Sequence, residues 1–430
     1  MERNMKRETG FSLIELLVAM AVTLVIVAAT LGLFTSALRT NESSQQLSNM
    51  NGNLRSAMNL MTRDLLQAGQ GIPTGGVLLP TGSGCKFVNR PVPVGTSTFV
   101  YGCTNSGTNP NLPAVVPGNA IGPIVPDTPP GPNGANLGSP NLSWVPSPGP
   151  SSDLVTMMFS DNTLVTNYII NGPILTPNYL ITISSSSMTF SNATPITGGS
   201  NTANIGDIFL VSGGGLSRYV VVTSVSGQTA NFASGDVLAM NQASTPGLTG
   251  TVKDLNTGGG VPFSASPACP QPAASPAAPY TSPPPSACAA TAQRVLMVSY
   301  WLDITQMVNG QVIPRLMRQI GLASPATCAQ TPPPLNGCPR AVAEVIESLE
   351  LSYDYVNGTV PVNNQVSSTA AATACACTIT DNQIRKVNLY LAGRSDAPIS
   401  QTNQYLRNNL ATQVDLRSLA FVNRYCTGSC

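Results

Sequence analysis

The feature that most constrains this chain is a long apolar run near its N-terminus that contains a single acidic residue. From Phe11 to Leu38 the only charged residue is Glu15, and the stretch Leu16–Leu38 carries no charge at all. As a helix rising about 1.5 Å per residue, that stretch would measure roughly 35 Å, enough to cross a hydrocarbon core of about 30 Å. The pattern therefore predicts a membrane-spanning helix over residues 11–38.

The residues around this run exclude two simpler interpretations. A secretory signal peptide would have a shorter apolar core and a small-residue cleavage site, and neither is present. A plain anchor would leave Glu15 unexplained, because an acidic side chain inside the bilayer costs on the order of 2–3 kcal/mol or more. Arg3, Lys6 and Arg7 outnumber the two acidic residues before the run, and this excess predicts a cytoplasmic N-terminus with the bulk of the chain exported.

The stretch "GFSLIELLVAM", which follows the basic flank, resembles the class III signal of type IV prepilins and type II secretion pseudopilins. The resemblance implies that a prepilin peptidase cleaves between Gly10 and Phe11, releasing residues 1–10 as a leader, and that Phe11 is then N-methylated. It also implies that Glu15, the fifth residue of the processed chain, meets the N-terminal amine of a neighbouring subunit during assembly. Opposite charges attract far more strongly in a dry environment than in water.

Beyond the apolar run, apolar residues recur at gaps of three and four, which is typical of one helical face. These residues are Leu47, Met50, Leu54, Ala57, Met61, Leu65 and Ala68. Gly69, Gly71 and Pro73 then act as stop signals. We expect one helix over 11–69, with a transmembrane part (11–38) and an amphipathic part (39–69) that packs on a globular domain.

The rest of the chain divides into loop-rich and strand-rich regions. Residues 70–152 are rich in Pro and Gly, most densely from Thr104 to Ser152, and predict a spacer loop, with a display or adhesion loop as the alternative. Short β-branched runs between turn residues predict an antiparallel, β-rich globular domain over 153–430, interrupted by a Pro-rich insertion near 266–291. The expected fold class is α+β and pilin-like, with long Pro/Gly-rich loop insertions.

Two further sets of motifs narrow the resemblance. The stretch "NLRSAMNLMTRDLLQAG" (53–69) is similar to the end of this helix in minor pilins of the PilW type and in J-type pseudopilins. The order of "GDIFLVS", "VLMVSYWLD", "LMRQI", "VAEVIESLELSYDY" and "IRKVNLYLAGRS" resembles the same proteins. The Pro/Gly-rich insertions lie outside the resemblance.

All the cysteines lie beyond the predicted span, on the exported side, where an even number favours disulfides. They are Cys85, Cys103, Cys269, Cys288, Cys328, Cys338, Cys375, Cys377, Cys426 and Cys430. The first six form three sequence-local pairs that would each close a loop, for about 2–3 kcal/mol each. The "CAC" pair is too close for a mutual bridge and could reach the terminal "CTGSC" instead, although sequence does not fix the connectivity. A tetrathiolate metal site is the alternative, but its spacing is unusual.

Composition argues against several functional classes. The chain has no histidine, which removes histidine-based catalytic and zinc sites, and its net charge of +1 argues against nucleic-acid binding. "GGGLS" and "NTGGGVP" lack a P-loop lysine and are interpreted as turns. Four acidic residues could form a weak cation site, although a solvated face is favoured: Glu344, Glu347, Glu350 and Asp354. We expect no enzymatic activity, no cofactor and no resident metal.

The sequence thus predicts a type IV pilus minor pilin that acts in priming or at the tip. Its expected partners are other pilins, the prepilin peptidase, the inner-membrane assembly machinery and the membrane itself. The precursor would be a single-pass inner-membrane protein, and the assembled subunit would reach the periplasm or the cell-surface pilus. The alternatives are a J-type pseudopilin of a type II secretion system and a pilus-tip subunit for adhesion or DNA uptake.

Overall fold

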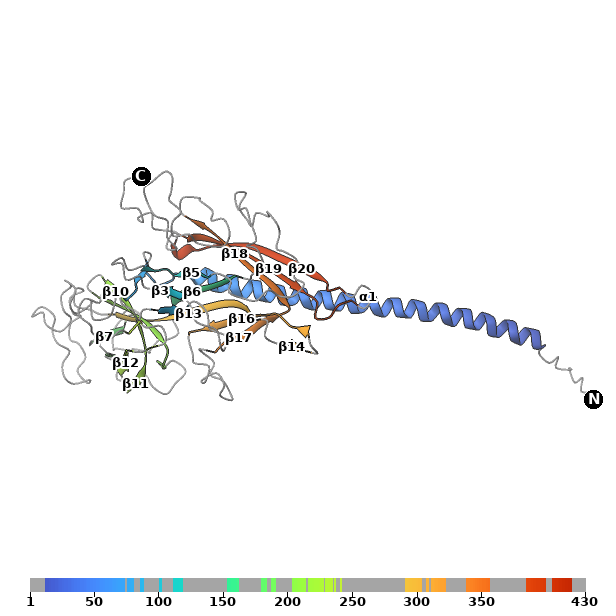
Figure 1. The fold of residues 1–430 in the computed structure, drawn as a ribbon, viewed down its shortest axis with the longest axis horizontal. Coiled ribbons are helices and arrows are strands. Elements are labelled where there is room, and N and C mark those ends of the chain that lie inside the picture. The colour runs from blue at the N-terminus through green and yellow to red at the C-terminus, as the bar shows by residue number, and fades with distance from the viewer. Residues whose placement is uncertain are drawn as a thin grey trace, which may run out of the picture. The chain divides into compact units, whose positions relative to one another are not determined.

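The fold was analysed in a computed structural model of the whole chain (Figure 1). The residues that the structure describes are 12–73, 76–80, 86–88, 100–102, 111–118, 153–161, 179–183, 187–190, 203–213, 216–227, 229–234, 236, 240–241, 291–303, 307–308, 311–321, 338–355, 384–399 and 404–419.

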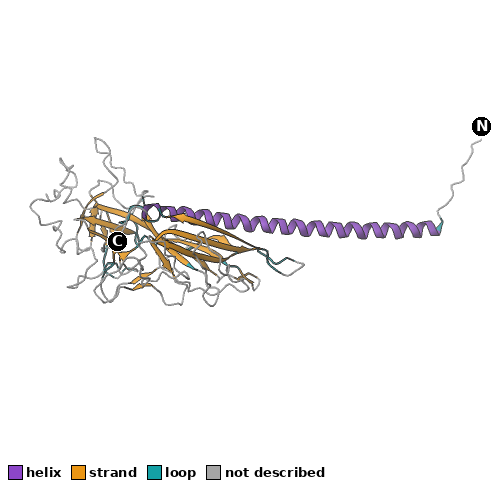
Figure 2. Cartoon of the chain, turned by 90° about the horizontal axis from the view of Figure 1, so that it is seen from above, coloured by secondary structure: helices purple, strands orange, loops and turns teal. Residues whose placement is uncertain are grey.

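One long helix, α1 (Leu13–Gln67), accounts for the predicted N-terminal helix (Figures 1 and 2). By length and composition it could cross a membrane, and its most apolar window has no buried side chain. Burial begins at Met50, and every later member of the predicted stripe is buried. Leu47 was predicted to belong to that stripe but is 42% exposed, so the packed face starts one turn later than the pattern indicated.

The predicted stop signals end the helix. Gly69 and Gly71 have φ angles of +82° and +73°, which favour glycine because a side chain would clash with the backbone. The Gly69 amide donates to the Met158 carbonyl at 2.9 Å, and the Ser160 amide donates to the Gln70 carbonyl at 2.8 Å. The turn after α1 is therefore hydrogen-bonded to a strand far along the sequence.

Strand β13 (Thr291–Asp303) is central to an 11-stranded antiparallel sheet, where it pairs with β6 (Leu154–Ser160), β7 (Tyr179–Ile183), β9 (Ile208–Gly213) and β16 (Arg315–Ile320). The remaining strands extend this sheet: β5 (Val115–Gly118), β8 (Ser187–Phe190), β10 (Leu216–Val221), β11 (Ser224–Ser226), β12 (Thr229–Asn231) and β17 (Arg340–Glu344).

A second sheet has the order β18 (Ile346–Tyr355), β19 (Ile384–Arg394), β20 (Arg407–Asp415), followed by the short 3-10 helix η2 (Arg417–Leu419). Three short two-stranded sheets complete the described strands: β1 (Val77–Leu78) with β4 (Asn111–Leu112), β2 (Lys86–Val88) with β3 (Val100–Gly102), and β14 (Met307–Val308) with β15 (Gln311–Val312). One helix combined with antiparallel sheets confirms the α+β, pilin-like fold class.

Two compact units emerge from the contacts. One comprises Met1–Gly52 with Arg394–Asn408, and the other comprises Asn53–Gly393 with Asn409–Cys430. The second unit contains the C-terminal part of α1, which packs on both sheets: Asp64 bonds to strand β13 and β16 side chains, and Leu54 lies against Gly393 of β19.

The structure differs from the sequence-based expectations in two places. The stretch "RAVAEVIESLELSYDY" begins with residues that predict a helix and ends in the alternation of a strand, but it is two strands, β17 and β18, separated at Val345, whose φ angle is +56°. Strands β1 to β5 all lie inside the region expected to be loop. Of these, β5 joins the large sheet, where Val115 and Val116 are buried as β5 pairs with β6. The run "LVTNYII" (164–170), whose β-branched residues predict a further strand, lies outside the described residues.

Candidate assembly site

The N-terminus of α1 is closed by a reciprocal pair of hydrogen bonds between Ser12 and Glu15. The Ser12 amide donates to Glu15 Oε2 at 3.0 Å, and the Glu15 amide donates to Ser12 Oγ at 3.2 Å. This S-x-x-E arrangement is a capping box, which satisfies two backbone donors that the first helical turn leaves without partners. Sequence reasoning missed it, although the "SLIE" spacing is its signature.

The capping box gives Glu15 a role within its own helix. Its carboxylate lies at the positive end of the helix macrodipole, which favours negative charge. One of its two oxygens, Oε2, accepts a hydrogen bond from the Ser12 amide, and this bond holds the side chain at the helix N-terminus. The remaining capacity of the carboxylate can still accept a hydrogen bond from a cation.

An open groove runs from Glu15 along the outer surface of α1. It is lined by Ile14, Glu15, Val18, Ala19, Val22 and Thr23, and all six residues are exposed. The structure thus places Glu15 at the end of an uncovered apolar surface. Gly10 and Phe11, the predicted cleavage and methylation residues, lie outside the described residues.

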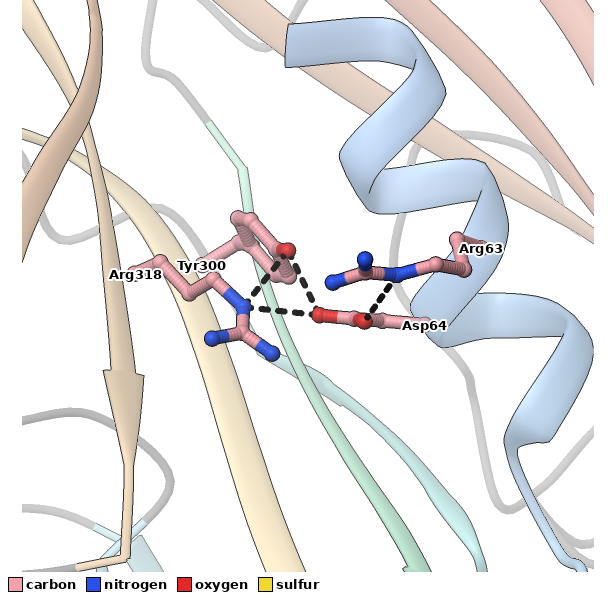
Figure 3. A network of polar contacts seen from close by, with 4 residues as sticks. All are labelled: Arg63, Asp64, Tyr300 and Arg318. Atoms are coloured by element: carbon pink, nitrogen blue, oxygen red, sulfur yellow. Dashed lines mark hydrogen bonds and ion pairs between the residues drawn. The ribbon is translucent and has the colours of Figure 1, made fainter. Parts of the chain in front are cut away.

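A buried polar network fixes the other half of α1 to the large sheet (Figure 3). Tyr300 Oη and Arg318 Nε each donate to Asp64 Oδ2 at 2.7 Å, and Arg318 Nε also lies 3.0 Å from Tyr300 Oη. Tyr300 and Arg318 are paired neighbours on β13 and β16. The Asp64 side chain is 2% exposed and therefore lies in a nearly dry site, where an unpaired charge would be costly. The guanidinium of Arg318 supplies the balancing charge.

The electrostatics of this network agree with its geometry. Burial, reinforced by the neighbouring Asp64 carboxylate, raises the pKa of Tyr300 far above its usual value, so its hydroxyl remains a donor. Arg63, next to Asp64 in the sequence, lies 3.6 Å from Asp64 Oδ1, but its side chain is 64% exposed. Asp64 was not singled out from the sequence, although it follows Met61 by three residues and so falls on the apolar stripe.

The other candidate residues have mixed outcomes. Cys338 is buried and disulfide-bonded, while the other nine cysteines lie outside the described residues, so the pairings stay predictions. Glu347 and Glu350 are 3% and 6% exposed, so the expectation of a solvated acidic face is wrong for both. Within the described part of the chain, no three or more His, Cys, Asp or Glu residues gather as a metal site would require.

Comparison with known proteins identifies one segment. Residues 5–31 match the family model described as the prokaryotic N-terminal methylation motif. This motif supports a type IV pilin-like prepilin. Together with the apolar helix that begins at Leu13, it supports processing by a prepilin peptidase and membrane anchoring of the precursor. No curated protein and no solved structure matches the chain.

Proposed function

We propose that this chain is a minor pilin: a structural subunit, present in few copies, that primes a type IV pilus or lies at its tip. The observation that carries the proposal is the division of α1 into two parts. The first part bears the methylation motif and an exposed apolar surface, and the second part is buried against the sheets. A helix of this kind can exchange lipid for neighbouring helices while its folded domain stays intact.

In this proposal the peptidase cuts between Gly10 and Phe11, and the new amine of Phe11 is methylated. Glu15 accepts the amine of a neighbouring subunit, so that two charges that are each costly in lipid offset one another. The capping box supports this role because it holds the carboxylate at the helix end while leaving part of its accepting capacity available.

Processing is tested by measuring the mass of the mature chain. Cells that have the prepilin peptidase should yield a chain lacking residues 1–10 and carrying one added methyl group. Cells without the peptidase should retain the leader. A chain of unchanged mass in both strains would overturn the assignment of Gly10 and Phe11.

Assembly is tested with two variants of one residue. Glu15→Gln keeps a side chain that can complete the capping box but removes the charge, whereas Glu15→Ala removes both. If charge pairing drives assembly, both variants should reach the membrane at normal levels and both should be absent from sheared filaments. Normal incorporation of Glu15→Gln would show that capping, rather than charge, is the function of Glu15.

The minor-pilin assignment is tested by the amount of this chain in purified pili and by the kind of filament with which it is recovered. Quantitative mass spectrometry of purified pili should find this chain at a small fraction of the major subunit. An amount equal to the major subunit, or recovery only with a secretion filament, would refute the assignment.

A further inference from the structure

We propose that the tip of the connection between β19 and β20 lies in the headgroup layer of the bilayer that holds α1, where Tyr405 and Arg407 contact phospholipid phosphates. The tip comprises the described residues 395–399 and 404–407. The inference goes beyond the proposed function and rests only on membrane anchoring of the precursor, whatever filament the chain enters later.

The tip belongs to the same compact unit as the apolar part of α1. That unit comprises Met1–Gly52 and Arg394–Asn408, and the connection lies beside the helix (Figure 1). Within the unit, the Asn408 side-chain amide donates to Asn51 Oδ1 at 2.7 Å. The tip is therefore attached to the helix that would cross the membrane, on the C-terminal side of the apolar run.

One face of α1 is covered from Met50 back to Ser43. Met50 is buried and Ser43 and Gln46 are half-buried, at gaps of three and four residues, whereas the other residues from 41 to 49 are exposed. Ser43 follows Leu38, the end of the uncharged run, by five residues or about 7–8 Å of helix. A headgroup layer is about 5–8 Å thick. The cover thus ends at the outer limit of that layer.

The tip has the length needed to provide this cover. Asn51 follows Ser43 by eight residues, which is about 12 Å along a helix. Asn408, which contacts Asn51, follows Gln404 by four residues, and four extended residues reach up to about 13 Å. The end of the tip can therefore lie level with Ser43, next to the membrane surface.

Backbone hydrogen bonds give the tip a defined shape. The Ser395 amide donates to the Leu406 carbonyl at 2.8 Å. Closer to the end, the Ile399 amide donates to the Gln404 carbonyl at 2.8 Å. Ile399 is half-buried, so part of an apolar side chain is presented at the end of the tip.

Tyr405 carries two guanidinium groups near its ring. The Cζ atom of Arg394 lies 4.1 Å from the ring centroid, and that of Arg407 lies 6.0 Å from it. Arg407 is exposed and Tyr405 is half-buried. Tyrosine is enriched at membrane interfaces because its ring is apolar and its hydroxyl polar, and a guanidinium binds phosphate oxygens through paired N–H groups. The exposed part of this stack has the chemistry that suits phospholipid headgroups.

The charges around the tip favour a local contact over a diffuse attraction. Arg39 is exposed directly after the apolar run, but Glu42 and Asp396 are exposed as well. The net positive charge near the membrane is therefore small, and Arg407 acts through direct contact with phosphate. A bilayer is the partner favoured here because the apolar run of the same helix ends at this level.

The chain offers a matched control in another exposed arginine, Arg417 of η2. Its neighbour Ser418 lies against Gly69. Gly69 follows Leu38 by 31 residues, or about 46 Å of helix, which is far beyond any headgroup layer. Changes at position 417 should therefore leave contact with lipid unaffected.

The first test identifies what lies against the tip in the full-length chain. A photo-cross-linking amino acid at position 399 should capture phospholipid in the membrane fraction of cells, and the same amino acid at position 417 should not. Capture of protein without lipid at position 399, equal capture of lipid at both positions, or no capture at position 399 would overturn the proposal.

The second test removes the charge of the tip. Arg407→Glu should lower lipid capture from position 399 by about fivefold or more, the effect of one basic residue at an anionic surface. Arg407→Gln should lower it by less, and Arg417→Glu should leave it unchanged. The melting temperature in detergent shows whether each variant is folded.

Unchanged capture in a folded Arg407 variant, or an equal loss with Arg417→Glu, would refute the contact between Arg407 and lipid. Neither test requires a filament. The amount of the chain in purified pili would therefore still decide the minor-pilin assignment if the membrane contact failed.

Discussion

Two acidic residues on one helix show how a carboxylate is accommodated where water is scarce. Glu15 lies in a segment long enough to span a membrane and is stabilised by the capping box at the helix N-terminus. Asp64 lies in a protein core, where Arg318 balances its charge and the Tyr300 hydroxyl donates a hydrogen bond to it. The Glu15 carboxylate can still accept a hydrogen bond from another molecule, whereas the contacts of Asp64 that hold it in place all come from its own chain.

Removing Asp64 should therefore be costly, because Arg318, whose side chain is only 17% exposed, would lose its counter-charge. We expect Asp64→Ala to lower the free energy of unfolding by about 3–5 kcal/mol. Arg63→Ala is the control: its side chain is 64% exposed, and an exposed ion pair contributes about 1 kcal/mol at most. Denaturant titration of the full chain in detergent measures both, and equal effects would show that the buried network is not what stabilises this contact.

For single residues, the sequence indicated the role of a charged side chain only where a local motif surrounds it. Glu15 stands out because it interrupts an apolar run. Asp64 does not, because its partners Tyr300 and Arg318 are more than two hundred residues away, and nothing local indicates that the chain brings them together. Glu350 was interpreted as solvated for the same reason, since burial on a sheet depends on what covers that face.

At the scale of elements, α1 was predictable almost to its ends because its signals are local: an apolar run, a stripe and glycine stops. The strands were harder where intrinsic preference and final structure disagree. "RAVAE" contains good helix formers yet pairs with β16, because tertiary pairing overrides a weak local preference. Likewise β5 forms in a loop-like stretch, because β6 supplies a partner strand.

Two glycines in and after α1 should respond to the same substitution in opposite directions. Gly52 is helical with open space around its Cβ position, so Gly52→Ala should raise the free energy of unfolding by about 1 kcal/mol. Gly71 has a φ angle of +73°, and an added Cβ would lie 2.5 Å from Ser160 Oγ. Gly71→Ala should lower the stability by at least 1–2 kcal/mol, roughly the cost of the left-handed conformation alone.

The melting temperature of the full chain in detergent measures both changes. A stabilising effect of Gly71→Ala would mean that the turn after α1 is not held in the described conformation.

Strand β18 contains a carboxylate that should make stability depend on pH. Glu350 Oε1 accepts from the Ser348 hydroxyl at 2.6 Å, whereas Glu350 Oε2 is buried and has no hydrogen-bond partner among the described residues. Burial raises the pKa of Glu350. The folded state therefore keeps this proton at pH values where the unfolded chain has lost it, so stability falls as the pH rises through the pKa of the folded state.

Glu350→Gln removes this titration and should raise the melting temperature at pH 7.5, with a smaller gain or none at pH 4. Glu344→Gln, at an exposed position on β17, provides the control and should have little effect at either pH. A gain for Glu350→Gln that is the same at both pH values would show that the effect is not electrostatic.

At the scale of the whole molecule, the predicted export of everything beyond the apolar run agrees with two separate features. The basic excess before Phe11 favours a cytoplasmic N-terminus, and the disulfide at Cys338 forms in an oxidising compartment. Neither feature depends on how the filament is built. Export and assembly can therefore be tested apart from each other.

Membrane orientation is best tested in cells lacking the prepilin peptidase, because the leader and any tag before Met1 then stay attached. We expect an N-terminal tag to be protected from protease added to spheroplasts and a tag after Cys430 to be digested. If the cysteines form disulfides on the exported side, the chain should also migrate differently on gels with and without reductant. Digestion of the N-terminal tag would place the basic flank outside, and a cleavage by a cytoplasmic-side peptidase at Gly10 would then be ruled out.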